Sequence, residues 1–425
     1  MNRSRIDVEI LPPAFTRERV AIQARVSGHP GRRRRNGRLF FEFPAELHPW
    51  SVIQGGPDDC HDAFARALVM SAMEARRDLA IHGRLSRSLL DNLARYQAIV
   101  GAGLPKYRPA EVLADEVIPC PAAPRAAGDE AIIGFSGGLD SVYTLYTHQK
   151  GIAAIGSRKI PNCLFVHGFD IPLDDAAYER AFESARRIAH ALSSRLFPMR
   201  TNLKAMVPVW PHSFGSALAA VLSLFERRYA AGLIASSYED DNPYTLESGT
   251  SSNRHADPLL SSHSFTILHD LGNNRAEKSA ILRDFEIGRR NLRVCWEGDD
   301  LAANCGVCSK CVLQMLAMKM AGVDDLSAFR SPLTPESVRG VNLYSRAFLW
   351  QWRGLIRYAA GRGWADRDLL DAMQQRADEC EGMLDAGQTP PSGSRTRPPR
   401  KRRGVVRWAK RLLSRARRRR DDAWP

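Results

Sequence analysis

The chain contains no hydrophobic run approaching the roughly 18 residues that a membrane-spanning helix needs, and its N-terminal "MNRSRIDVEI" has no apolar signal core. It also shows no internal repeat and no Ser-His-Asp or Cys-His arrangement typical of nucleophilic enzymes. The amino-acid composition is ordinary for a soluble globular protein, since 44% of the 425 residues are hydrophobic and 25% are charged. We therefore expect a cytoplasmic protein with two or three domains.

Positive charge is concentrated at the C-terminal end. The chain carries +14, but Ser392–Pro425 holds fourteen Lys/Arg and two Asp, which leaves the first 391 residues near +2. The basic composition therefore does not indicate a nucleic-acid-binding core. In the tail, Val405, Trp408 and Leu412 share one helical face among Lys and Arg, which suits peripheral attachment to an anionic membrane surface. Binding to nucleic-acid phosphates and a disordered, solvated tail are the alternatives.

Periodicity and composition predict how the chain is divided. Apolar alternation indicates strands within residues 1–50, and apolar residues three and four apart indicate helices over 60–101. The arginines at 32–35 are expected at a solvated hairpin tip, and residues 118–129, rich in Pro, Ala and Gly, are typical of a linker. The predicted parts are an N-terminal α+β region (1–120), an α/β domain (130–322), a helical region (323–388) and a basic tail that is disordered or amphipathic (389–425).

From residue 130 onward, short apolar strands alternate with helical segments. The predicted strands are "EAIIGF", "PNCLFVHGF", "RLFPMRTNL", "AGLIASSY" and "SFTILHD". Strands separated by helices form parallel β-α-β units with right-handed crossovers, so we expect an α/β fold with a doubly wound parallel sheet. Ligands of such sheets bind beyond the carboxyl ends of the strands.

The segment "SGGLDS" follows the first of these strands and precedes a helix. Gly137 and Gly138 allow positive φ and a close approach to a ligand, and successive N–H groups there can form an anion-binding nest. The hydroxyls of Ser136 and Ser141 can donate to phosphate oxygens, and the start of the helix adds its free N–H groups. An ordinary helix cap by Asp140 or Ser141 is the alternative. The spacing matches neither a Walker P-loop nor the dinucleotide G-x-G-x-x-G pattern.

Half of the eight cysteines lie within seventeen residues, in the pattern C-x9-C-x2-C-x2-C. The four thiolates of Cys295, Cys305, Cys308 and Cys311 suit a tetrahedral zinc ion, and Gly306 permits the tight turn between two of them. The motif contains no His or carboxylate and thus no obvious open position, so we expect a structural zinc. An iron–sulfur cluster uses the same ligands and is the alternative.

The loop Ser136–Ser141 resembles the PP-loop of the N-type ATP pyrophosphatases, whose pattern is S-G-G-x-D-S. The resemblance implies an adenine nucleotide alpha hydrolase-like fold, cleavage of ATP between its α- and β-phosphates, and Mg²⁺ beside the pyrophosphate. It implies catalytic roles for Asp140, Ser141 and Lys278, although Lys278 also fits a surface helix. It places ATP against Ser136, Gly137, Gly138, Asp140 and Ser141, with His167 and Asp170 of "VHGFD" beside the adenosine.

The loop and the four cysteines together resemble one branch of that superfamily, the 7-cyano-7-deazaguanine synthases, over about residues 130–322. This resemblance implies an ATP-dependent ligase that adenylates a carboxylate and then lets ammonia or an amine displace AMP. The carboxylate would belong to a small molecule or to a carrier, and a homodimer is a further expectation. Ser236, Ser237, Glu239 and Asp257 follow the fourth strand, where the acceptor is expected, and each could equally cap a loop.

Two other functions fit parts of the pattern. A PP-loop sulfurtransferase acting on tRNA would need a reactive cysteine or an iron–sulfur cluster near ATP. Cys163 opens the second strand at the end away from the expected site, and Cys120 lies in the linker, so neither is well placed. A non-catalytic nucleotide-binding adapter is the third possibility, against which the intact loop argues.

Overall fold

The computed structural model of the chain describes residues 4–29, 36–119, 128–244 and 252–388. The arginines at 32–35, Cys120 and the basic tail with Val405, Trp408 and Leu412 lie outside these residues. The predictions made for them therefore stay predictions.

One ten-stranded, mostly parallel sheet runs through the molecule in the order β10-β9-β6-β7-β8-β3-β2-β1-β4-β5. Parallel pairing joins β10 through β8 and also β1, β4 and β5, whereas β8-β3, β3-β2 and β2-β1 are antiparallel. The strands are β1 (Arg5–Phe15), β2 (Arg19–Ser27), β3 (Asn36–Pro44), β4 (Asp78–Ser86), β5 (Val112–Ile118), β6 (Glu130–Gly134), β7 (Lys159–His167), β8 (Arg195–Thr201), β9 (Ala231–Ile234) and β10 (Thr266–His269).

The five strands predicted after residue 130 are confirmed as β6 to β10. Counted from β6, they lie in the order 3-2-1-4-5, so the order reverses between β6 and its neighbours β7 and β9. Such a reversal opens a crevice at the carboxyl ends of the central strands, which is where open α/β sheets bind ligands. The α/β class is thereby established, and the order is compatible with a Rossmann-like fold.

Helices cover both faces of this parallel half. On β6, Ile132 joins the hydrophobic core that contains α6, whereas the adjacent Ile133 joins the core that contains α3 and α4. This alternation explains why the strands are apolar throughout, as is usual for parallel strands buried on both sides. The α-helices are α1 (Asp62–Ala75), α2 (Arg87–Gly103), α3 (Leu139–Gln149), α4 (Ala177–Ala191), α5 (Leu203–Met206), α6 (Trp210–Ser223), α7 (Arg275–Ser279), α8 (Glu286–Asn291), α9 (Ser309–Met320), α10 (Pro335–Arg339), α11 (Arg346–Gly361) and α12 (Arg367–Asp385).

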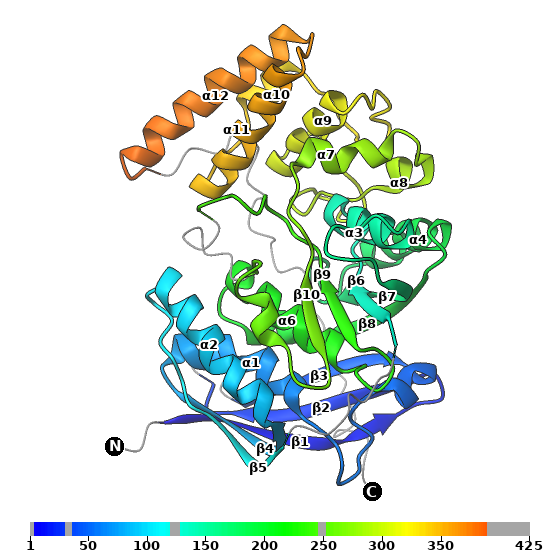
Figure 1. Cartoon of the computed structure of the whole chain (residues 1–425), viewed down its shortest axis with the longest axis vertical. Helices are drawn as coiled ribbons and strands as arrows, with labels where there is room; N and C mark the ends of the chain where they lie inside the picture. Colours follow the sequence, from blue (N-terminus) through cyan, green and yellow to red (C-terminus); the bar gives the residue numbers. More distant parts are fainter. Residues whose placement is uncertain (1–3, 30–35, 120–127, 245–251, 389–425) are drawn as a thin grey trace, which may run out of the picture.

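The N-terminal strands extend the same sheet instead of forming a sheet of their own. The junction is the short antiparallel pairing of Phe41 with Thr201 and Glu42 with Arg200. Helices α10 to α12 gather at the opposite end of the molecule from β1 to β5 (Figure 1). They share a core with α3, α4 and α9, through Trp352 and Leu355 among others.

Within residues 60–101, the continuous helical prediction is wrong over Asp78–Ser86. This segment, "DLAIHGRLS", forms β4 between the helices α1 and α2. Its local apolar spacing fits a helix, but it pairs with β1 on one side and β5 on the other. Tertiary pairing thus overrides the local pattern.

Candidate active site and metal centre

The Ser136–Ser141 loop joins the carboxyl end of β6 to α3. Gly137 has a φ of +73°, a left-handed conformation that favours glycine. Gly138 is the N-cap of α3 and no side chain caps the helix, so neither Asp140 nor Ser141 performs the ordinary capping role. Ser141 instead donates to the Gly138 carbonyl at 3.0 Å, and the Gly138 N–H donates to Ser136 Oγ at 3.3 Å. The first turn of α3 therefore presents N–H groups that no side chain of its own satisfies.

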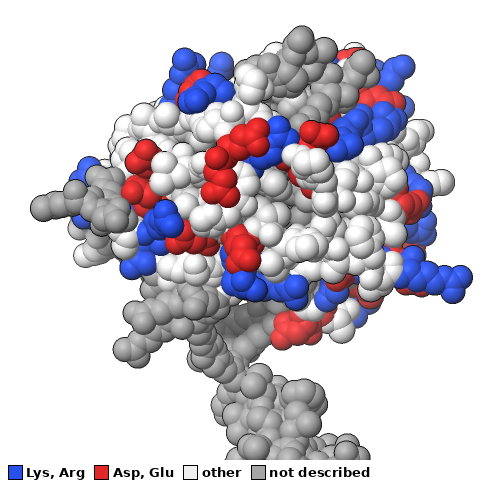
Figure 2. Space-filling view, turned by 90° about the horizontal axis from the view of Figure 1, so that it is seen from below, with Lys and Arg blue, Asp and Glu red and all other residues white. Residues whose placement is uncertain are grey.

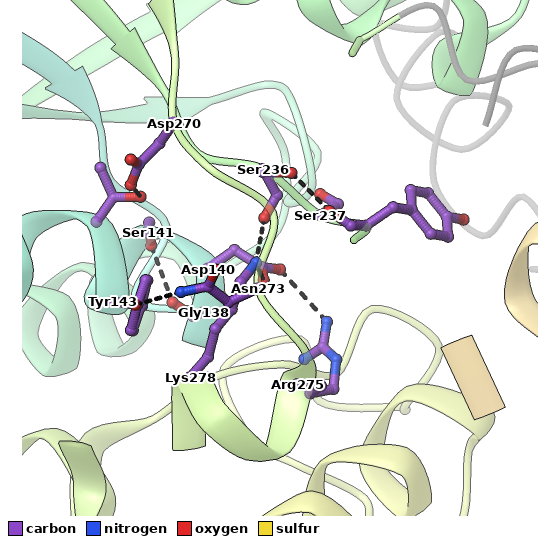
Figure 3. A network of polar contacts seen from close by, with 12 residues as sticks. Gly138, Asp140, Ser141, Tyr143, Ser236, Ser237, Asp270, Asn273, Arg275 and Lys278 are labelled. Atoms are coloured by element: carbon purple, nitrogen blue, oxygen red, sulfur yellow. Dashed lines mark hydrogen bonds and ion pairs between the residues drawn. The ribbon is translucent and has the colours of Figure 1, made fainter. Parts of the chain in front are cut away.

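Lys278 reaches this loop from α7. Its ammonium donates to Asp140 Oδ1 at 3.0 Å and to the Ser236 carbonyl at 2.6 Å, and the residue is only 2% exposed (Figure 3). The position follows from local sequence, because Asn274 and Glu277 form a capping box that starts α7 directly after the β10 exit. The prediction of a loop-facing lysine thus agrees with the geometry, whereas the surface alternative does not.

Arg275 is a second cation beside Asp140. Its guanidinium lies 3.3 Å from Asp140 Oδ2 and donates to Gln314 Oε1 at 2.8 Å. Burial alone would raise the pKa of Asp140, but the charges of Lys278 and Arg275 outweigh it and lower that pKa. The carboxylate is therefore ionised and held by two cations. Sequence reasoning missed Arg275, although it stands three residues before Lys278 and hence on the same helix face.

Two further hydrogen bonds fix α3 to the exit of β10. Thr144 Oγ1 donates to Asp270 Oδ2 at 2.6 Å, and Asn273 Nδ2 donates to the Tyr143 hydroxyl at 2.7 Å (Figure 3). These bonds join the second turn of α3 to the segment between β10 and α7.

His167 is the last residue of β7 and Asp170 follows it, but their contacts are made outside the Ser136–Ser141 loop. His167 is buried, stacks on Tyr178 with ring centroids 3.9 Å apart, and bonds through Nε2 to the Pro172 carbonyl at 2.9 Å. Burial lowers its pKa, so the ring is neutral at pH 7. Asp170 is exposed and lies 3.7 Å from the guanidinium of Arg293. Both residues stand at the same edge of the sheet as the loop.

A cavity of about 230 Å³ opens beside the Lys278 contact, after β9 and β10. Ser236, Ser237 and Glu239 line it, and Glu239 is 9% exposed with no hydrogen-bond partner for either carboxylate oxygen among the described residues. Burial raises the pKa of Glu239. A buried carboxyl group without a partner is costly for stability, and such groups gather at functional sites.

Asp257 stands behind this cavity. It is fully buried, accepts from Ser252 Oγ at 2.8 Å and contacts His269 Nδ1 at 2.7 Å, and both of these partners line the cavity. Of the four residues predicted to face an acceptor, three therefore reach the cavity directly and Asp257 orients its wall. His269 was missed, and its place at the end of β10 was the available signal.

The four cysteines converge as predicted. All four sulfur atoms lie within 4.8 Å of one another, with Cys295–Cys308 and Cys305–Cys311 separations of 3.8 and 3.9 Å. A regular tetrahedron with Zn–S bonds of about 2.3 Å has edges of about 3.8 Å, so the thiolates fit a zinc ion. Disulfide sulfurs would be about 2.05 Å apart. Hydrogen bonds from Cys305, Cys308 and Cys311 lower the pKa of Cys295 far below its ordinary value.

The turn within this cluster requires its glycine. Gly306 has a φ of +82°, and an added Cβ would lie 2.5 Å from the Ser331 carbonyl oxygen. Asn304 completes the support, because its Oδ1 accepts from the N–H groups of Val294 at 2.8 Å and of Cys295 at 3.1 Å. The four cysteines thus lie close enough to hold a metal ion, and surrounding hydrogen bonds support their positions.

Within the four described stretches of chain, no helix is both long and apolar enough to cross a membrane. No protein-family model, curated protein or solved structure matches the chain.

Proposed function

We propose that the protein is an ATP-dependent carbon–nitrogen ligase that forms AMP and pyrophosphate. The observation that carries the proposal is the uncapped first turn of α3 beside the Lys278–Asp140–Arg275 cluster at the ends of parallel strands, in which both cations are buried and Asp140 is partly exposed. Free N–H groups and two cations around one loop suit a polyphosphate. The finer fold assignment, a doubly wound sheet of the adenine nucleotide alpha hydrolase type, belongs to the same proposal and is supported by the 3-2-1-4-5 strand order.

In this proposal the backbone of Gly137 and Gly138 and the hydroxyls of Ser136 and Ser141 bind the pyrophosphate part of ATP. Lys278 and Arg275 offset the negative charge that grows on the departing pyrophosphate. Asp140 is the carboxylate placed to hold Mg²⁺, which would neutralise phosphate charge.

His167 and Asp170 are the proposed neighbours of the adenosine. The His167 ring is buried and neutral and stacks on Tyr178. The assignment of His167 and Asp170 rests on the resemblance of "VHGFD" to the adenosine-facing segment of the N-type ATP pyrophosphatases, and it is supported by the edge of the sheet that both residues share with the loop.

The cavity lined by Ser236, Ser237 and Glu239 is the proposed acceptor site. A carboxylate oxygen attacks the α-phosphorus of ATP, and the bond to the bridging oxygen breaks as pyrophosphate leaves. An amine nitrogen then attacks the acyl carbon, AMP leaves with the former carboxylate oxygen, and one proton is released. The protein contributes position and charge, and no nucleophilic side chain is required.

Sulfur transfer is disfavoured by the thiols outside the four-cysteine cluster. Among the described residues these are Cys60, Cys163 and Cys380, all buried, and burial raises the pKa of each. Cys163 lies within β7 and not at its end. Thiols kept protonated inside a core are poor nucleophiles.

The test is the identity of the products. Purified protein with Mg²⁺, α-labelled ATP, ammonium chloride and 7-carboxy-7-deazaguanine labelled with ¹⁸O in its carboxylate should yield AMP and pyrophosphate, with ¹⁸O in the AMP. Lys278→Met should lower the yield of both products by about 10²- to 10³-fold, whereas Lys319→Met, on the exposed Lys319–Asp324 ion pair, is the matched control and should not. Formation of ADP and phosphate, or AMP without ¹⁸O, would contradict the proposal.

A further inference from the structure

Arg293 lies between the Ser136–Ser141 loop and the four-cysteine cluster. It is 6% exposed and lies two residues before the metal ligand Cys295. A guanidinium buried in this way offers five fixed donors, so its partners reveal what it holds together.

On the loop side, Arg293 bonds to two successive carbonyl oxygens. Its main-chain N–H donates to the Gly137 carbonyl at 2.9 Å, and its guanidinium donates to the Ser136 carbonyl at 3.3 Å. Each carbonyl shares a planar trans peptide with the next residue's N–H, which points the opposite way. Arg293 therefore sets the direction of the Gly137 and Gly138 N–H groups.

On the cluster side, the same guanidinium donates to the Cys295 carbonyl at 3.5 Å and to the Leu301 carbonyl at 3.3 Å. Both carbonyls belong to the segment that carries Cys295 toward Cys305. The guanidinium also lies 3.7 Å from Asp170, the predicted adenosine neighbour. One side chain thus contacts the loop, the metal-ligand segment and the exit of β7.

We infer that Arg293 is a positioning residue that couples metal occupancy of the four-cysteine cluster to the geometry of the Ser136–Ser141 loop. A bound metal fixes the Cys295 segment, and that segment fixes both the guanidinium and the main chain of Arg293. The guanidinium then holds the Ser136–Gly137 peptide, and the main-chain N–H holds the Gly137–Gly138 peptide. Loss of the metal then loosens the loop and weakens phosphate binding. The inference rests on the proposed function, which supplies the ligand of the loop. It adds that metal binding by the four cysteines controls how tightly the loop binds that ligand.

The experiment measures hydrogen exchange of loop peptides covering residues 136–141, and affinity for Mg²⁺–ATP, with and without metal. In the wild-type protein, removal of the metal should speed loop exchange and raise the Kd about tenfold, the usual size of effects from outer-shell partners. Arg293→Ala should show both changes with the metal bound. Metal removal should then change both quantities less than in wild type, because only the main-chain bond from residue 293 to the Gly137 carbonyl still joins the segment to the loop. Arg293→Lys, which keeps the charge but not the fork of donors, should behave like Arg293→Ala.

The matched control is Arg376→Ala, which removes another buried arginine that bonds a carbonyl, that of Val341 at 2.6 Å. It should lower stability and leave loop exchange unchanged. The inference is overturned if Arg293→Ala with bound metal exchanges like wild type, or if it responds to metal removal as strongly as wild type. Should metal removal unfold the whole chain, the comparison of the metal-bound Arg293 and Arg376 variants decides. Wild-type protein that fails to bind ATP would refute the proposed function alone, because loop exchange still reports the coupling.

Discussion

In the half of the sheet formed by β10, β9, β6, β7 and β8, helices cover both faces and charged side chains meet in buried groups at the strand ends. In the half formed by β3, β2, β1, β4 and β5, charged side chains pair across the outward face. Arg25 contacts Glu9 there, and His82 lies between Asp7 at 3.1 Å and Asp115 at 3.2 Å. Charges of both signs are interspersed on the side of the molecule seen in Figure 2.

The exposed ion pairs of the N-terminal half are of the kind that aids solubility and folding. The charged side chains at the strand ends of the parallel half are instead grouped at the candidate site. Exposed ion pairs contribute about 0–1 kcal/mol each and are screened by salt. The side chains of Lys278, Arg275 and Asp140 are only 3%, 9% and 23% exposed, and buried ion pairs are weak evidence for stability, whereas perturbed charged groups gather at functional sites. The parallel half thus carries the candidate site, and the N-terminal half continues its sheet through β3.

The largest expected effect follows from removing a metal ligand in the parallel half. Cys308→Ser leaves three thiolates, and structural zinc sites contribute on the order of 10 kcal/mol to folding in small domains. We expect zinc content to fall from about one ion to nearly none per chain, with early unfolding of the α9 region. Elemental analysis and hydrogen exchange measure this. Normal zinc content in the variant would contradict the assigned ligand set.

Replacing Lys278 tests the charge arranged for chemistry. Lys278→Met keeps the length of the side chain and removes the cation, so pyrophosphate formation should fall by about 10²- to 10³-fold, as for loss of one preorganised donor. Steady-state turnover measures the loss. An equal loss of pyrophosphate formation in the control Lys319→Met would contradict a special role for the buried Lys278 charge.

Asp140→Asn should destabilise the fold by about 3 kcal/mol at pH 7, because it leaves two cations without their carboxylate. The folded-state pKa of Asp140 is lowered, so its stabilisation is present above the unfolded value near 3.9 and is lost as pH falls through the lower folded value. Urea unfolding should show a constant gap between wild type and variant above about pH 5 that narrows in acid. A gap that widens in acid would oppose the assignment.

Glu239→Gln should raise the stability of the protein and lower its activity toward the acceptor. At pH 7 the buried, unpartnered carboxyl is costly, so the neutral amide should add about 1 kcal/mol to the free energy of unfolding. Because the folded-state pKa of Glu239 is raised, this gain should shrink as pH falls toward the unfolded value near 4.3. The acceptor kcat/KM should fall about tenfold while the Kd for ATP stays constant. An altered Kd for ATP with normal acceptor use would place Glu239 in a different site.

The smallest effect is expected on the outward face of the N-terminal half. Hydrogen bonds to Asp7 and Asp115 raise the pKa of His82, so its stabilisation is present below about pH 6.5 and is lost as pH rises through the raised value. The side chain is 39% exposed, which limits the contribution to a few tenths of a kcal/mol. His82→Asn should therefore lower stability slightly at pH 6 and not at pH 9, with unchanged ATP turnover.

The sequence predicted the elements whose signals are local. All five strands of the parallel half, the loop after β6 and the convergence of the four cysteines follow from apolar runs, glycine placement and spacing. The strand β4 was missed because its partners β1 and β5 are distant in sequence. The continuity of the sheet rests on two residue pairs, Phe41–Thr201 and Glu42–Arg200, which no local pattern announces.

Some residues of the candidate site also have a local sequence signal, and others are brought together only by folding. Lys278 was predicted, and Arg275 could have been, because a three-residue spacing on a helix places both on one face. Arg293 has no motif of its own, and only the folded chain shows that it touches both the loop and the Cys295 segment. His269 lies between these cases, because its place at the end of β10 was visible in the sequence but its contact with Asp257 depends on the folded chain.

A crystal structure with α,β-methylene-ATP and Mg²⁺ would show where the protein binds the phosphates of ATP. We predict that the terminal phosphates lie against the Gly137 and Gly138 amides and the Ser141 hydroxyl, within reach of Lys278, with β1 to β5 unchanged. Nucleotide bound on the N-terminal half, or phosphates placed away from this loop, would contradict it.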